Sequence, residues 1–304
     1  MAEVAHHLSW LEAGVVGAMQ GVSELFPVSS LGHSVLLPAV VGGSWARDLN
    51  VASPESPYLA FIVGLHVATA IALIIYFWRD WLRVIGGLLS SIRDRRITTS
   101  DQRLAWLLVL ATIPVGLVGV IFEHWLRTHL GRPVPAAIFL IVNGLVLIGA
   151  EQLRRKDPEL QTEYVDERVT GPISDARLAR LPWLRGVLIG SAQILALAPG
   201  LSRSGMTMVA GMLRGLSRED AARFSFLLAT PVILAAGALK IPDLTGHLGD
   251  GIRGQALFGA VLSGIGAYLA VRFLTRYFAV RSLRPFGVYC IAAGAASLVW
   301  FAVR

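Results

Sequence analysis

Charged residues are scarce in this chain of 304 residues. Asp, Glu, Lys and Arg make up 15% of it, whereas apolar residues make up 55% and the mean hydropathy is +0.63. A water-soluble domain of this size needs more polar surface. Because the apolar excess cannot all be packed in a core, we expect much of it to face lipid.

The chain has a single cysteine, and its first residues do not resemble a targeting segment. Cys290 is the only cysteine, which excludes an intrachain disulfide. Residues 1–14 have no basic region ahead of an apolar stretch, so we expect no cleaved signal peptide. The net charge is +7, but the arginines cluster between apolar runs and form no single stripe. They therefore indicate the positive-inside bias of membrane proteins, and not nucleic-acid binding.

Long apolar runs dominate the chain, and crossing a bilayer takes about 20 such residues. Two further apolar segments, 10–40 and 186–215, are broken near the middle by Pro, Ser and Gly. Broken backbone at membrane depth is tolerated only inside protein or beside a wet cavity, so we expect both to be re-entrant. The predicted fold is an all-α polytopic membrane protein with six transmembrane helices and two re-entrant helix-loop-helix segments. The six runs are 58–77, 104–123, 134–150, 221–239, 254–274 and 285–303.

Basic residues distinguish the connections between these runs. Three arginine-rich connections are expected to be cytoplasmic, namely 78–103, 151–185 and 275–284. The remaining connections carry fewer basic residues and are expected outside, together with both termini. They are 41–57, 124–133 and 240–253.

The same unit, a re-entrant segment followed by three spans, occurs twice. GAMQ at 17–20 begins the first broken segment and GSAQ at 190–193 begins the second. Because three is odd, the second copy is expected to be inverted, which places a site between the repeats. The predicted organisation is a first repeat over 1–150, a polar cytoplasmic linker over 151–185 and a second repeat over 186–304.

The first broken segment carries the motif QGVSELFPVSSLGH, from Gln20 to His33. Gln20 and Glu24 are four residues apart and so share a helix face. An ionisable residue within a membrane segment indicates function, because a lone charge there is costly. Glu24 could hold a divalent cation or accept a proton, and His33 could act as general acid or base. Ser29 or Ser30 could be a nucleophile or a phosphate donor, or only a helix cap.

The second broken segment carries PGLSRSGMT, from Pro199 to Thr207. Gly200 and Gly205 allow a tight turn that presents backbone N–H groups. Arg203 supplies a planar, permanently charged fork that suits phosphate. A phosphate site is therefore predicted, the alternative being a loop arginine that pairs with lipid headgroups. The added hydroxyls are those of Ser202, Ser204 and Thr207.

Together the two motifs resemble the two signatures of the undecaprenyl-diphosphate phosphatase family, also called the bacitracin-resistance protein family. The first signature is Glu or Gln, three residues, Glu, then Pro-Val-Ser-Ser-x-Gly-His. The second is Pro-Gly-x-Ser-Arg-Ser-Gly-x-Thr. Gln20, Glu24, 27–33 and 199–207 match them, and the similarity continues through 223–229.

The resemblance implies hydrolysis of undecaprenyl diphosphate to the monophosphate, in the bacterial plasma membrane, at a site that faces outside. It implies dependence on Mg²⁺ or Ca²⁺, with Glu24 as essential acid and metal ligand. His33 would be the essential imidazole, Arg203 the phosphate clamp and Ser30 the candidate nucleophile. Gln20 stands where many members have Glu, which weakens a metal site with two carboxylates. The expected substrate-binding residues are Gln20, Ser29, Ser202, Ser204, Gly205 and Thr207.

Several alternatives stay open or are argued against. A water could attack in place of Ser30, and the chain could flip the lipid phosphate as a transporter. A phosphatidic-acid-phosphatase type of enzyme would need a histidine where Val209 stands. A chloride-type channel gives no reason for Glu24 and His33. His66, in the first span, lies either near the site or at a helix interface, and a homodimer is an open option for the partner.

Overall fold

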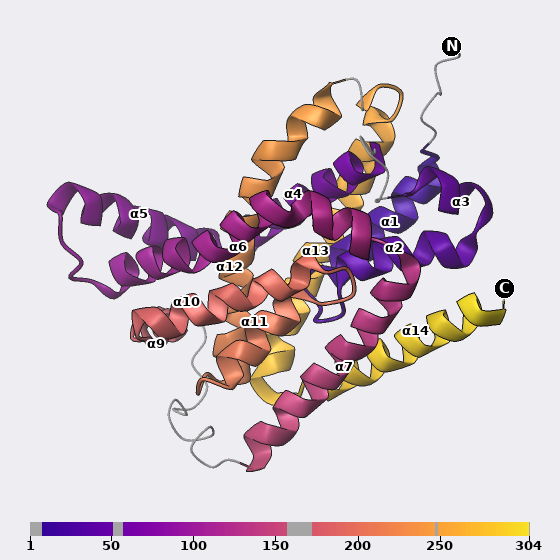
Figure 1. Ribbon diagram of the computed structural model, residues 1–304. Helices are drawn as coiled ribbons and strands as arrows, with labels where there is room; N and C mark the ends of the chain where they lie inside the picture. Colours follow the sequence, from indigo (N-terminus) through magenta and orange to yellow (C-terminus); the bar gives the residue numbers. More distant parts are fainter. Residues whose placement is uncertain (1–7, 51–56, 157–171, 247–248, 304) are drawn as a thin grey trace.

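The computed structural model describes residues 8–50, 57–156, 172–246 and 249–303, and its regular structure in these ranges is helical (Figure 1). Among the described residues, six helices are long and apolar enough to cross a membrane, which confirms the six predicted runs. Many of their large apolar side chains point outward, and Val120 is 71% exposed. Lipid would cover these side chains. The six are α4 (Pro57–Tyr76), α6 (Ser100–Leu130), α7 (Pro133–Lys156), α12 (Arg218–Thr245), α13 (Arg253–Val280) and α14 (Arg284–Val303).

The two broken segments fold as short helices on either side of a turn. At 1.5 Å per residue none of these helices spans the roughly 30 Å of a bilayer core, as a re-entrant segment requires. Ser29 and Ser202 end the turns, and each caps the following helix with its hydroxyl. The first segment consists of α1 (Trp10–Ser23) and α2 (Ser30–Val41). The second consists of α10 (Trp183–Ser191), the 3₁₀ helix η1 (Ala192–Leu197) and α11 (Arg203–Met212).

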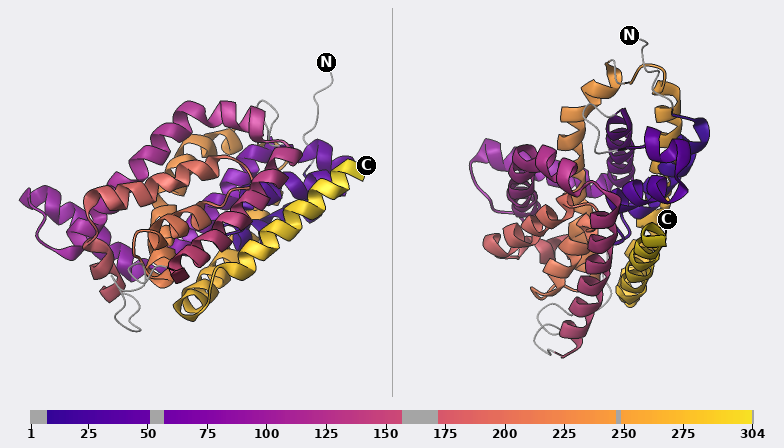
Figure 2. Two further views of the ribbon diagram at one scale, coloured as in Figure 1. Left: turned by 60° about the horizontal axis from the view of Figure 1, so that its bottom comes forward. Right: turned by 45° about the vertical axis from the view of Figure 1, so that its right-hand side comes forward.

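Corresponding spans of the two halves run in opposite directions. Where α4 meets α12, Gly64 lies against Leu244 whereas Gly237 lies against Val67, so the chains are antiparallel. The third spans, α7 and α14, also cross antiparallel and lie side by side in every view (Figure 2). An inverted duplication requires this arrangement.

The halves also exchange their broken segments. α1 packs along α13 of the second half, and α10 packs along α6 of the first. The contact is backbone to backbone, since a Cβ on Gly21 would lie 2.2 Å from the Ser263 carbonyl oxygen. On the other side, a Cβ on Gly190 would lie 2.3 Å from the Ala111 carbonyl oxygen. Small residues permit such close crossings, so each half holds the other's short helices in place.

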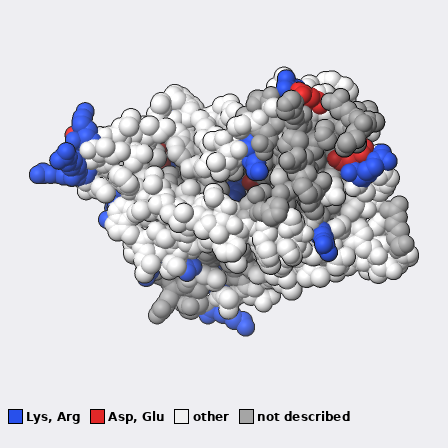
Figure 3. All heavy atoms as spheres, turned by 45° about the horizontal axis from the view of Figure 1, so that its top comes forward, with Lys and Arg blue, Asp and Glu red and all other residues white. Residues whose placement is uncertain are grey.

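Three described helices lie in connections for which no helix was predicted, and the first is α3 (Gly43–Asp48). α5 (Trp78–Asp94) is amphipathic, and α9 (Pro172–Ala179) packs against α6 and α12. Residues 157–171 of the expected linker lie outside the described part of the chain, but its later part is folded onto the protein. Figure 3 shows a face that is largely free of charge. Lys and Arg lie mostly toward its edges, and a few basic and acidic atoms appear side by side near its centre.

Candidate active site

The two sequence motifs lie in direct contact at their turns. The Ser29 hydroxyl accepts hydrogen bonds from the backbone N–H of Gly32 at 3.2 Å and of Gly200 at 3.1 Å. Ser29 takes a φ of 68°, a left-handed conformation that is uncommon outside glycine. A Cβ on Gly32 would lie 2.8 Å from the Gly200 Cα. Ser29, predicted as substrate-binding, therefore joins the first motif to the second.

Asn143 of α7 fastens the same two turns from the other side. Its amide nitrogen donates to the Pro27 carbonyl at 2.9 Å, and its amide oxygen accepts from the Ser202 N–H at 3.0 Å. The side chain is fully buried. Sequence reasoning missed this residue, although an amide within an otherwise apolar span is a signal that could have found it.

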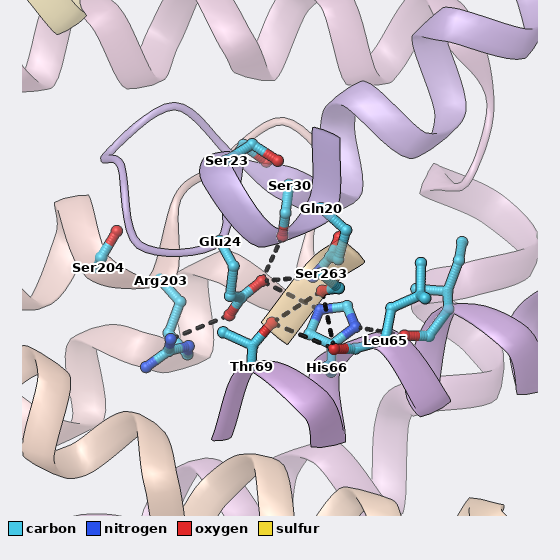
Figure 4. Close-up of polar contacts among 12 residues, drawn as sticks. Gln20, Ser23, Glu24, Ser30, Leu65, His66, Thr69, Arg203, Ser204 and Ser263 are labelled. Carbon is cyan, nitrogen blue, oxygen red and sulfur yellow. Dashed lines mark hydrogen bonds and ion pairs between the residues drawn. The ribbon is translucent and has the colours of Figure 1, made fainter. Parts of the chain in front are cut away.

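Glu24 is the centre of the site (Figure 4). It is only 6% exposed, and donors face both carboxylate oxygens. Arg203 donates to Oε1 at 2.9 Å. Ser30 donates its hydroxyl to Oε2 at 2.5 Å, Gln20 donates its amide at 3.0 Å, and His66 Nε2 lies 3.1 Å from the same oxygen. A buried carboxylate is tolerable only when it is paired in this way.

Two polar atoms beside Glu24 are buried and have no hydrogen-bond partner among the described residues. They are the amide oxygen of Gln20 and Nη1 of Arg203. The amide of Gln20 cannot be reversed, because its oxygen would then face the carboxylate. The site thus offers an unused acceptor and an unused charged donor on either side of one carboxylate. Such atoms suit a cation and a phosphate oxygen.

The two histidines lie apart. Of the predicted catalytic set, Glu24, Ser30 and Arg203 come together, but His33 is not among the contacts of Glu24. Its Nδ1 lies 2.8 Å from the Ser29 carbonyl oxygen, and its Nε2 lies 2.7 Å from the Tyr289 hydroxyl. The His33 and Tyr289 rings are stacked. The imidazole against Glu24 belongs instead to His66.

The hydroxyls of the second motif shape its turn. Ser202 accepts from the Gly205 N–H at 3.1 Å and shares a hydrogen bond with Ser204 at 3.0 Å. Thr207 donates to the Arg203 carbonyl at 2.8 Å. In this structure they hold the backbone that carries the Arg203 side chain. Direct contact between these hydroxyls and phosphate stays a prediction.

The oxygen ligands at the site show whether the predicted divalent cation could bind there. No group of three or more His, Cys, Asp or Glu side chains suited to a metal is found among the described residues. Mg²⁺, however, commonly takes one or two carboxylates and completes its shell with water and substrate phosphates. The Glu24 carboxylate and the unpartnered Gln20 oxygen fit such an ion. They do not fit a cage made of protein ligands alone.

Known proteins resemble this chain over nearly its whole length. The family described as "Bacitracin resistance protein BacA" matches residues 13–296. An undecaprenyl-diphosphatase of Mycolicibacterium paratuberculosis is 62% identical, over 98% of this chain and 99% of that protein. Undecaprenyl-diphosphatase 1 of Frankia casuarinae is 50% identical over 97% of this chain and 99% of its own. Undecaprenyl-diphosphatase 2 of Chromobacterium violaceum is 42% identical, over 95% and 98%. The chain belongs to the bacitracin resistance protein BacA family.

Proposed function

We propose that this chain is an integral membrane phosphatase that hydrolyses undecaprenyl diphosphate to undecaprenyl phosphate and inorganic phosphate. One observation carries the proposal: a buried carboxylate, Glu24, contacts a serine hydroxyl through one oxygen and an arginine through the other. A serine hydroxyl that contacts a carboxylate base can act as a nucleophile. An arginine guanidinium next to them can bind the phosphate that is attacked. Membership of the BacA family supports the same activity.

The proposed reaction begins with Ser30. Its Oγ attacks the terminal phosphorus while its proton passes to Oε2 of Glu24. The bond from that phosphorus to the bridging oxygen breaks, and undecaprenyl phosphate leaves with the bridging oxygen. Arg203 turns from Glu24 to the phosphoryl oxygens and stabilises the charge that they carry. Water then attacks the phosphorus of the phosphoserine, the bond from that phosphorus to Oγ breaks, and Glu24 returns its proton to Oγ. These steps release inorganic phosphate and restore the serine.

We propose that Glu24 and Gln20 hold the divalent cation, Mg²⁺ or Ca²⁺. When bound, the ion would neutralise negative charge on the diphosphate. His33 stays a candidate catalytic residue, acting from the turn that it shares with Ser29 and Ser30.

We also propose that the site faces outside the bacterial plasma membrane. The spans α4 and α13 run in the same direction, since Leu65 bonds to Ser263 and Tyr76 to Thr275. Arginine-rich connections follow the ends of both spans, so their starts lie outside. α1 runs parallel to them, with Gly17 against Gly259 and Gly21 against Ser263. The turn between α1 and α2 therefore dips into the membrane from the outer side.

The decisive experiment measures phosphate release from purified, detergent-solubilised protein given undecaprenyl diphosphate, with and without a chelator. We expect Ser30→Ala to lower kcat by about 1000-fold or more, as loss of a nucleophile does. Ser23→Ala is the matched control, because the Ser23 hydroxyl only bonds back to the Met19 carbonyl. No release by the wild type would favour a lipid-phosphate transporter. Near-normal release by Ser30→Ala would replace serine attack with direct attack by water.

A further inference from the structure

His66 lies on α4, which contributes no part of either motif. Its Nε2 is 3.1 Å from Oε2 of Glu24, and its Nδ1 is 2.8 Å from the Ile62 carbonyl oxygen. Both ring nitrogens thus face oxygen atoms that can accept a hydrogen bond. The side chain is 22% exposed.

A polar layer fixes that helix against α13. The hydroxyls of Thr69 and Ser263 both donate to the Leu65 carbonyl, each at 3.1 Å, and lie 3.2 Å from one another. All three residues are buried. α13 also carries α1 through the Gly21 contact. His66 and Glu24 are therefore positioned by one rigid unit made of α1, α4 and α13 (Figure 4).

The carboxylate needs a support of this kind during the proposed reaction. Before substrate binds, Arg203 holds Oε1 while three donors hold Oε2. Nη1 of Arg203 is available for phosphate, and the phosphate charge would draw the guanidinium from Oε1. With that contact weakened, the carboxylate could rotate away from the serine. Of the donors on Oε2, Ser30 is the attacking group and cannot also be the support. Among the described side chains, Gln20 and His66 are then left to hold this oxygen in place.

We infer that His66 is a positioning residue that keeps Oε2 of Glu24 against the Ser30 hydroxyl while Arg203 binds phosphate. The inference rests on the proposed function and deepens it. His33 cannot position Glu24 from its place in this structure, because its ring nitrogens form hydrogen bonds with Tyr289 and Ser29 instead. The two imidazoles therefore have separate tasks.

The test compares His66→Leu with His66→Gln in the phosphate-release assay. Leu removes the donor, whereas the amide of Gln can still donate to Glu24. We expect the Leu variant to lose about 30-fold to 100-fold in kcat with KM within about threefold of the wild type, as for a lost orienting partner. We expect the Gln variant to stay within about fivefold of the wild type. If His66 had a purely structural role, kcat would fall to a similar extent in both variants.

The control is His129→Leu, at an exposed histidine near the end of α6, which should leave kcat unchanged. Should the Leu variant fail to fold, His66→Asn replaces it, because the shorter amide cannot reach Glu24. A Leu variant with near-normal kcat overturns the inference, and so does a Gln variant no better than Leu or Asn. Absence of release by the wild type would instead contradict the proposed function.

Discussion

Gln20 is the residue at which this site departs from one with two carboxylates. Its amide nitrogen supports Glu24 at 3.0 Å, and its oxygen is left without a partner among the described residues. A second carboxylate here would lose the support and place two negative charges within hydrogen-bond distance. Only a bound cation would offset that repulsion.

Gln20→Glu should therefore make the enzyme more dependent on divalent cations. We expect activity in chelator to fall, and the Mg²⁺ concentration for half-maximal release to drop by about tenfold, because ligand charge raises affinity. Phosphate release and the thermal midpoint would both be measured across an Mg²⁺ titration. Gln255→Glu, two turns before Ser263 on α13, is the control. An unchanged Mg²⁺ requirement would argue against Gln20 as a cation ligand.

At this scale the sequence indicated what lies within the motifs, left His66 open between the site and a helix interface, and missed Asn143. Glu24, Ser30 and Arg203 were predicted, and the structure brings them together. His66 and Asn143 are single polar residues in apolar spans, with no local pattern that ties them to a motif. Their partners are far away in the sequence, so only tertiary packing shows what they contact.

At the scale of elements, the predicted spans were confirmed while α5 and α9 were missed. α5 has a helical signal, because Leu82, Ile85, Leu89 and Ile92 recur at intervals of three and four residues. α9 has a weaker signal in the sequence, because ion pairs with distant residues of α5 and α12 hold it in place.

Asp175 of α9 is the centre of those ion pairs, and we expect Asp175→Asn to destabilise the protein. The carboxylate is 2% exposed and pairs with Arg83 at 2.6 Å and Arg223 at 2.7 Å. Removing one partner of a buried pair costs about 3–5 kcal/mol. Asp80 still faces Arg223 and should keep the loss toward the lower figure.

Thermal unfolding in detergent would measure this effect as a lower apparent midpoint. Arg93→Gln is the control, because the Arg93–Asp94 pair is exposed and such pairs contribute about 0–1 kcal/mol. Equal midpoints for the two variants would show that α9 is not held by its charges.

At the scale of the whole molecule, the two halves are joined by exchange. The first motif belongs to the first half, yet α1, which leads into it, rests on α13 of the second. The repeat was visible in the sequence as GAMQ and GSAQ, but this exchange was not. The local sequence of a short helix does not show whether that helix packs against its own half of the protein or against the other half.

Gly21→Ala should disturb the site through this contact. Its Cβ would lie 2.2 Å from the Ser263 carbonyl oxygen, so α1 must move and carry Gln20 and Glu24 with it. A shift of about 1 Å can cost about 100-fold in rate, and we expect kcat to fall by at least about tenfold. Gly149→Ala on α7 is the matched control, since nothing lies within 4 Å of its Cβ. If both variants release phosphate at the wild-type rate, the close crossing does not position the site.

Asn143 links the two broken segments in a way that opposes the motion on which transporters with inverted repeats depend. Inverted repeats with broken helices are typical of transporters, in which one half rocks against the other. Here one side chain bonds to the first broken segment at Pro27 and to the second at Ser202. Rocking that separated the segments would have to break both bonds in a buried setting. We therefore expect the two turns to stay together during the reaction, so that the lipid headgroup must reach them by moving within its own leaflet.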